Sequence, residues 1–447
     1  MSTGSAGKLG LWTAAAIVVA NMIGTGIFGS SGYQAADLHD GGTMLFAWFL
    51  GGLLALAGAT AYGELGAMMP RAGGEYVYLR EAYHPAVGAM SGWVSLFAGF
   101  SAPIATSALL FGKYTGVVWP ALAGDTNAKL IGVVLILAMM SLHAFDTVIG
   151  GRVQAAFTLG KVILIAGFIA AGLLLGEGDW HQLSPRAGGL DNVAGEPFAM
   201  SLYWVTLAYL GWNAAAYIAS DLENPQKTLP RSLLLGTVVV MVLYLLANVT
   251  FLYALSPEML AGKDGGGPIA EVGAATARAL FGARIGDTVA AIIALALVSS
   301  VSAMVMAGPR VYASMAEDGA LPRILAQKTS RGVPAVSVVV QGVLACAFVL
   351  VGDLKPLVAY IGFTLSIFGA LAVAAVIVLR IKRPDAPRPY RASLYPIAPI
   401  LFVAVSAWAA FVQIRWNPWN AAYGGGTILA GFLVYLLTSR RSAAVSQ

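Results

Sequence analysis

Runs of apolar residues long enough to cross a bilayer constrain this chain more than any other feature of its sequence. A helix needs roughly 20 apolar residues to span the hydrocarbon core of a membrane, and twelve such runs can be read along the chain. Their approximate limits are 9–33, 43–69, 85–115, 129–147, 150–175, 198–220, 232–255, 287–313, 334–351, 355–380, 394–414 and 423–439. We therefore expect an all-α integral membrane protein with twelve transmembrane helices. Residues 1–447 form one unit, because no polar stretch is long enough for a separate domain.

The composition agrees with a chain that is embedded in lipid. Only 11% of its residues are charged and 58% are hydrophobic, whereas soluble proteins carry about 25% charged residues. This excludes a cytosolic enzyme, a nucleic-acid-binding protein and a disordered chain. The net charge of +5 is attributed to cationic cytoplasmic loops, so the expected partners are the lipid bilayer and a small molecule, and not a nucleic acid.

The distribution of Lys and Arg residues predicts the orientation of the chain. When both termini are placed in the cytoplasm, most Lys and Arg residues of the loops fall on the cytoplasmic side, as the positive-inside rule requires. The short loops and short N-terminus are typical of a bacterial protein, so the expected location is a bacterial inner membrane. The only cysteine, Cys346, and the four scattered histidines give no metal-ligand spacing. We expect no metal and no cofactor.

Two spans contain residues that weaken a helix near its centre. The first span carries Gly24 and Gly26 on either side of Thr25, and glycine lowers helix stability. Taken alone, this pattern fits close helix packing better than a site. In the sixth span, Thr206, Tyr209, Trp212 and Asn213 surround Gly211, and polar side chains there are costly unless they face protein or a cavity.

The two weakened spans occupy matching positions in two halves of opposite orientation, because five spans, an odd number, lie between their starting points. Interrupted helices in corresponding positions of inverted halves indicate the binding site of a secondary transporter. Unwinding frees backbone N–H and C=O groups that hydrocarbon cannot satisfy. The free N–H groups suit a carboxylate and the free carbonyls suit an ammonium group, so a zwitterionic amino acid is the expected ligand.

Three charged positions bear on this hypothesis. Lys161 lies well inside the fifth span, where it either snorkels to the surface or faces the bundle interior. In the second case its ammonium takes the place of a sodium ion between carbonyls of the first span and hydroxyls of the eighth, as a fixed strut or as a proton carrier.

Glu64 is expected to pair with a loop arginine or a backbone amide. We predict no acid at the level of the binding site, which disfavours a cationic substrate. Asp221, at the end of the sixth span, is expected to belong to an inner gate.

Four segments of the chain, in order, carry a family pattern: 23–28, 62–76, 208–231 and 310–322. They resemble the amino acid–polyamine–organocation superfamily of secondary transporters, and the resemblance covers nearly the whole length. Arg152-Val153-Gln154 leading to Lys161 resembles the L-amino-acid-transporter-like branch and its bacterial amino acid permease relatives.

The resemblance implies a leucine-transporter-type fold. Residues 9–175 and 198–380 would be two inverted repeats of five helices, and 394–439 two additional helices. It also implies the roles of individual residues. The substrate carboxylate would bind amides of Gly24, Thr25 and Gly26, and the amino group carbonyls near Met22, Ile23, Leu207 and Leu210. The other implied roles are pocket lining for Ala208 and Asn213, a sodium-mimicking pair of Lys161 and Ser300, and gating for Leu207, with Tyr209 and Trp212 beside it.

Two positions depart from the pattern of the superfamily. Leu207 is smaller than the aromatic residue that relatives often place at the gate. Leu210 stands where some relatives carry a second glycine, which predicts a narrower side-chain pocket and smaller substrates.

The resulting hypothesis is a sodium-independent transporter of neutral L-amino acids that works by alternating access, as an exchanger or as a proton-coupled permease. A cationic amino acid or polyamine antiporter of the same fold is the alternative. An intramembrane enzyme is disfavoured, because the spans contain no nucleophile–base or metal constellation. Whether an accessory subunit is present is left open.

Overall fold

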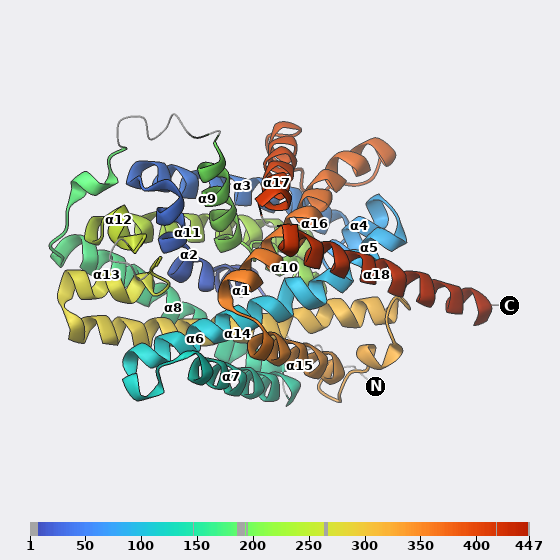
Figure 1. The fold of residues 1–447 in the computed structure, drawn as a ribbon. Coiled ribbons are helices and arrows are strands. Elements are labelled where there is room, and N and C mark those ends of the chain that lie inside the picture. Colours follow the sequence, from blue (N-terminus) through green and yellow to red (C-terminus); the bar gives the residue numbers. More distant parts are fainter. Residues whose placement is uncertain are drawn as a thin grey trace.

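The computed structural model describes residues 8–145, 147–185, 193, 195–262, 267–416 and 418–445. Within these ranges every regular element is a helix, and the helices form a single bundle (Figure 1). The all-α prediction is confirmed. The α-helices are α1 (Leu11–Met22), α2 (Thr25–Leu38), α3 (Gly41–Met68), α4 (Glu75–Ala82), α5 (Pro85–Val94), α6 (Ala102–Val118), α7 (Asp125–Phe145), α8 (Thr147–Leu175), α9 (Glu196–Ala208), α10 (Ala214–Tyr217), α11 (Pro225–Ala254), α12 (Pro257–Leu260), α13 (Val272–Phe281), α14 (Ala283–Glu317), α15 (Ala335–Val351), α16 (Leu354–Lys382), α17 (Ile397–Trp416) and α18 (Pro418–Val445).

Ten helical segments of the described chain are long and apolar enough to cross a membrane. They correspond to the predicted spans except for the sixth, which is divided into α9 and α10, and the ninth, which is the shorter α15. The count of twelve spans stays a prediction. The sequence analysis did not anticipate α4, α12 or α13, because these short helices lie in the connections between spans.

The two predicted interruptions are present. The first span is divided between α1 and α2 at Ile23 and Gly24, and the sixth is divided between α9 and α10 over residues 209–213. A π-helical turn over Ser95–Ser101 joins α5 to α6, and such turns are frequent at functional sites.

The long helices enclose the interrupted ones. Helix α11 packs against both α1 and α3, α14 packs against α6 and α8, and α9 packs against α2 and α3. The short helices α4 and α5 lie at one end of the bundle and α12 and α13 at the opposite end (Figure 1). The two interruptions therefore lie inside the protein, where their unpaired backbone groups are screened from lipid.

Some predictions fall outside the described part of the chain. The termini, 1–7 and 446–447, belong to this group, and so do the side chains of Arg152, Val153 and Gln154. The predicted orientation also counts Arg186 and Lys263, which are not among the described residues.

Candidate functional site

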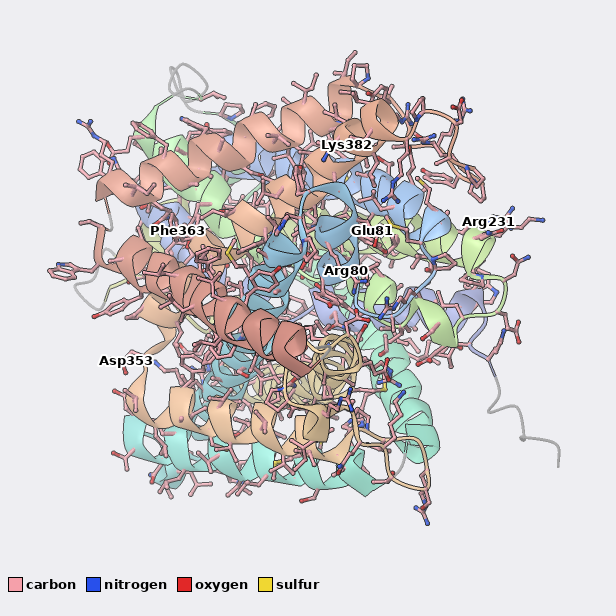
Figure 2. The ribbon with its side chains drawn as sticks, turned by 90° about the vertical axis from the view of Figure 1, so that its right-hand side faces the viewer. Arg80, Glu81, Arg231, Asp353, Phe363 and Lys382 are labelled. Carbon is pink, nitrogen blue, oxygen red and sulfur yellow. The ribbon has the colours of Figure 1, made fainter. Side chains whose placement is uncertain are left out.

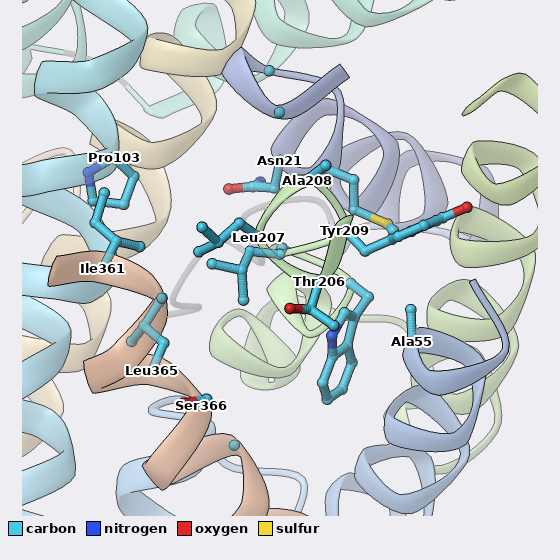
Figure 3. Close-up of a pocket in the computed structure, with 18 of the residues that line it drawn as sticks. Asn21, Ala55, Pro103, Thr206, Leu207, Ala208, Tyr209, Ile361, Leu365 and Ser366 are labelled. Atoms are coloured by element: carbon cyan, nitrogen blue, oxygen red, sulfur yellow. The ribbon is translucent and has the colours of Figure 1, made fainter. Parts of the chain in front are cut away.

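A cavity lies beside both interruptions and extends between α3, α6, α16 and α17 (Figure 3). Most of the residues predicted for substrate binding line it. These residues are Met22, Gly24, Thr25, Gly26, Leu207, Ala208, Leu210 and Asn213. The gating candidates Tyr209 and Trp212 and the predicted partner of Lys161, Ser300, line it too. Ile23 and Lys161 are not part of this lining, since both are buried behind it.

The first interruption presents the N-terminus of α2 to the cavity. Helix α2 begins at Thr25 and has no side-chain cap, and its preceding residue Gly24 adopts φ −149° and ψ −142°. The first N–H groups of a helix have no acceptor within the helix. Together with the positive end of the helix dipole they favour an anion. Thr25 and Gly26, in this first turn, border the cavity, so the position suits a carboxylate.

The carbonyls at the end of α1 are bound by side chains from other helices. The Lys161 ammonium on α8 donates to Ile23 O at 2.7 Å, to Ala20 O at 3.4 Å and to Ser300 Oγ at 2.8 Å. Ser300 Oγ on α14 donates to the same Ile23 O at 2.6 Å. Lys161 is 1% exposed. It therefore joins α1, α8 and α14 and does not snorkel to the surface.

Tyr244 on α11 connects the two interruptions, and the sequence analysis missed it. Its hydroxyl lies 2.5 Å from Met22 O and 3.1 Å from Ala208 O, so both carbonyls share one donor. Tyr244 lies in the middle of the long, largely apolar helix α11, four residues before Asn248, and matches no site motif. No local signal in the sequence could have identified it.

Two glycines allow the interrupted segments to approach each other. A Cβ on Gly26 would lie 2.2 Å from Ala208 Cα, so α2 and α9 touch through their backbones. Gly211 has φ +103°, and its Cβ would lie 2.8 Å from Asn21 C and O. The glycines that the sequence marked as helix-weakening therefore also permit close contact.

The second interruption is held by a network of neutral groups around a carboxylate. Asn213 Nδ2 donates to Glu75 Oε1 at 2.7 Å and to Tyr217 OH at 2.8 Å. Tyr62 OH of α3 donates to the same Glu75 Oε1 at 2.6 Å. Asn213 thus lines the cavity while it fixes the end of the interruption to α4.

Glu75 corrects the prediction that no acid lies at the level of the site. It is 7% exposed and lines the cavity. It falls between the spans predicted at 43–69 and 85–115. The turn at Gly73 and Gly74, which have φ of +117° and +52°, directs α4 back into the bundle. This return depends on tertiary packing, so it could not be seen in the pattern of the span.

The three gating candidates differ in their surroundings. Leu207 is half-buried and packs against α16: a Cβ added to Gly362 would lie 2.5 Å from Leu207 Cδ2. Figure 3 shows Leu207 across the cavity from Ile361 and Leu365, while Tyr209 extends away from them. Tyr209 OH donates to Trp48 O at 3.1 Å. The Trp212 ring meets Tyr62 edge to face at 4.7 Å. Leu207 is the least buried of the three candidates, since Tyr209 is 1% and Trp212 7% exposed.

Tyr33 and Trp204 form a further part of the lining that the sequence analysis missed. Their rings stack at 5.1 Å, and both border the cavity. They lie on α2 and α9, on the far side of the interruptions from Tyr217. Aromatic residues are frequent throughout this chain, so these two gave no distinguishing signal.

Two acids outside the cavity hold basic residues. Glu64, 1% exposed, accepts bonds from Arg380 at 2.9 and 2.6 Å and from the Ala392 N–H at 2.7 Å, and Arg388 lies 3.3 Å away. The prediction for Glu64 is confirmed. Asp221 accepts a bond from Arg310 at 3.1 Å. Its gating role stays a prediction.

These features define a membrane transporter in which two interrupted helices present backbone groups to one internal cavity. A model of the amino acid permease family matches residues 9–435, and the chain belongs to this family. The resemblance to the amino acid–polyamine–organocation superfamily is therefore confirmed, and the chain is a permease and not an enzyme.

Several characterised transporters are similar over nearly the whole chain. The serine/threonine exchanger SteT of Bacillus subtilis (strain 168) is 31% identical over 98% of this chain and 98% of its own length. The large neutral amino acids transporter small subunit 2 of Homo sapiens is 28% identical over 96% of this chain and 80% of its own. The b(0,+)-type amino acid transporter 1 of Mus musculus is 28% identical over 96% and 87%.

Proposed function

We propose that this permease carries neutral L-amino acids by alternating access without sodium, as an exchanger or coupled to protons. The observation that carries the proposal is the cavity that borders both the free N-terminus of α2 and the second interruption. The names of its relatives agree with it, since two are a serine/threonine exchanger and a large neutral amino acids transporter.

The bound amino acid would be held at both of its charged groups. Its carboxylate would accept bonds from N–H groups of Gly24, Thr25 and Gly26, where the helix dipole favours an anion. A carbonyl oxygen has two lone pairs, and Ile23 O already accepts two donors. The substrate ammonium would therefore use Met22 O and Ala208 O, beside Leu207 and Leu210.

Lys161 would replace a sodium ion in this carrier. Its ammonium already occupies the position between Ile23 O and Ser300 Oγ, where a cation would otherwise be needed to satisfy these oxygens. Leu207 would close the cavity over the substrate, with Tyr209 and Trp212 supporting the segment from behind. Residues 9–175 and 198–380 would act as two inverted repeats that move around the site.

Glu75 keeps a second candidate in consideration. A carboxylate in the cavity lining could attract the side chain of a cationic amino acid or a polyamine. The b(0,+)-type transporter of Mus musculus is one of the relatives. A thermal-shift screen of the purified protein with neutral amino acids, cationic amino acids and polyamines distinguishes the two candidates, because a ligand that binds the folded state stabilises it.

Reconstitution of this chain alone in liposomes tests the transport itself. We expect labelled neutral amino acid to enter when the lumen holds unlabelled amino acid or when a proton gradient is present, and to be unaffected by removal of sodium. Uptake by the single chain also tests whether an accessory subunit is needed; we propose that none is. The location in a bacterial inner membrane with both termini in the cytoplasm is part of the proposal. Labelling of cysteines introduced at the two termini, in whole cells, tests it.

A further inference from the structure

Glu75 lies in a part of the cavity that contains only neutral partners. Tyr62 OH and Asn213 Nδ2 both bond to its Oε1, and the Tyr217 hydroxyl interacts with the same carboxylate. Tyr78, on the same helix, also faces it. Within the described part of the chain, no Lys, Arg or His side chain forms an ion pair with Glu75 and none lines the cavity.

The charged groups of the helices that pack against α4 are held elsewhere. Asp318, after α14, accepts bonds from Arg71 and Arg80 and, at 2.9 Å, from Tyr76 OH. On α16, Lys382 donates to Ala82 O at 2.9 Å and Arg380 donates to Glu64, and directly after this helix Arg383 donates to Glu81 at 3.0 Å.

None of the residues in these contacts lines the cavity. Figure 2 shows Arg80 and Glu81 close to each other near the middle of the view, well away from Asp353. On α5, His84 caps its own helix by accepting a bond from the Ala86 N–H at 3.1 Å. Among the described residues, Glu75 is therefore left without a cationic partner.

A buried carboxylate without a counter-ion is costly in its charged form. Burial raises the pKa of Glu75 above the usual value of a glutamate, although the hydrogen bonds from Tyr62, Asn213 and Tyr217 oppose this rise. A hydroxyl group can either donate or accept a hydrogen bond. Tyr62 and Tyr217 can therefore serve both the carboxylate and the carboxylic acid while the heavy atoms keep their positions.

We propose that Glu75 is the group that binds and releases the coupling proton when this permease carries an amino acid, an inference that rests on the transport function proposed above. One O–H bond forms on the Glu75 carboxylate when a proton arrives from the side to which the cavity is open. The same bond breaks when the cavity opens to the other side. Each cycle moves one positive charge with the substrate, and no oxidation or reduction is involved.

The position of Asn213 connects this proton to the substrate. Asn213 bonds to Glu75 and belongs to the interruption that borders the cavity. A protonated Glu75 is a weaker acceptor for the amide of Asn213, because a hydrogen bond to a charged group is stronger than one to a neutral group. Protonation therefore loosens the attachment of the second interruption to α4.

Lys161 is less suited to carry the proton. Its ammonium has three acceptors, it is 1% exposed, and it does not line the cavity. A lysine that released its proton would leave Ile23 O without its charged donor. We therefore assign Lys161 the role of a fixed strut.

Proteoliposomes that contain no internal amino acid test the assignment. With an acidic outside and a neutral lumen, we expect the wild-type protein to accumulate a neutral amino acid. Glu75→Gln should lose this accumulation and its dependence on pH, yet still exchange external for internal amino acid. Glu81→Gln, which changes a partly exposed carboxylate on the same helix, should behave as the wild type.

Three results would overturn the assignment. One is accumulation driven by the proton gradient in Glu75→Gln at the wild-type level. Another is a wild-type protein that exchanges amino acids but ignores the proton gradient. A third is loss of only cationic substrates in Glu75→Gln with an unchanged pH profile, which would make the carboxylate a substrate group. If the wild type neither exchanges nor accumulates any amino acid, the transport function itself fails instead.

Tyr62→Phe provides a second test that does not depend on the folding of Glu75→Gln. This variant removes a donor that stabilises the charged carboxylate, so the pKa of Glu75 should rise. The midpoint of uptake against pH should then shift to a more alkaline value. A Tyr62→Phe protein that transports with an unshifted midpoint contradicts the assignment.

Discussion

Both interruptions break a helix and free its backbone groups, but the two are held in different ways. At the first, a buried ammonium and a serine hydroxyl on the long helices α8 and α14 bind the carbonyls of α1. At the second, an amide, tyrosine hydroxyls and one carboxylate fix the segment to the short helix α4. The first interruption is tied to the rigid frame of the bundle, and the second to an element between spans.

This difference indicates how the two segments divide the work of transport. Charged hydrogen bonds are roughly twice as strong as neutral ones, and the Lys161 ammonium donates to three acceptors. The first interruption is thus suited to hold a constant binding geometry. The second depends on bonds to the Glu75 carboxylate, whose strength would change with the protonation proposed for that residue. It is suited to change during the cycle.

Lys161→Ala should have the largest effect, because it removes the attachment of the first interruption to the frame. A hydrogen bond to a charged group contributes about 1.5–3 kcal/mol, so losing the ammonium should lower uptake by roughly 100-fold or more. The protein should still insert and fold. Initial rates of exchange in proteoliposomes measure the loss.

Lys113→Ala is the matched control for this change. Lys113 is a partly exposed lysine 3.9 Å from Asp125, and its removal should leave exchange intact. If Lys161→Ala retained full exchange, the first interruption would not need its strut, and the contrast drawn between the two segments would be lost.

Gly26→Val should abolish ligand binding by forcing the two interruptions apart. Any Cβ at this position would lie 2.2 Å from Ala208 Cα, and backbone atoms cannot move aside as a flexible side chain can. We expect the stabilisation of the protein by a bound amino acid to disappear in a thermal-shift assay. Gly167→Ala on α8, where nothing lies within 4 Å of the added Cβ, should keep it.

Much of the first interruption can be predicted from the sequence alone. Gly24, Thr25 and Gly26 are adjacent in the chain, and the one lysine inside a span is conspicuous against apolar neighbours. The partners expected for this lysine are the carbonyls of the first span and the hydroxyl groups of the eighth span, because these are the acceptors that neighbouring spans offer. The bonds from Lys161 to Ile23 O and Ser300 Oγ match the arrangement that the sequence predicted, while their role in transport stays a prediction.

The second interruption could be predicted only in part. Gly211 marks the break that follows α9, but the residues that hold the segment come from α3, α4 and α11, and no local pattern relates them. Glu75 falls between the spans predicted at 43–69 and 85–115, and only tertiary packing returns α4 to the bundle. Tyr244 looks like any tyrosine of an apolar helix. Contacts of this kind depend on the three-dimensional arrangement and leave no periodic signal.

Gly211→Ala should weaken the second interruption to an intermediate extent. A residue other than glycine with φ of +103° is strained by roughly 1–2 kcal/mol, and its Cβ would also crowd Asn21. We expect a lower melting temperature and weaker amino acid binding. A variant with unchanged stability would show that the segment adopts another backbone conformation, and that its turn is not fixed as described.

Tyr244→Phe should have the smallest effect, and it acts on both interruptions at once. The hydroxyl that faces Met22 O and Ala208 O is removed while the ring is kept, so the loss is that of a neutral hydrogen bond, about 1 kcal/mol. Substrate affinity should fall by roughly fivefold, as measured by titration calorimetry.

Tyr253→Phe, on the same helix, removes a hydroxyl that bonds to Gly176 O outside the cavity and should leave affinity unchanged. Equal losses in both variants would mean that the shared donor does not position the two carbonyls for the substrate. A loss confined to Tyr244→Phe would show that the first and the second interruption are coupled through one hydroxyl group.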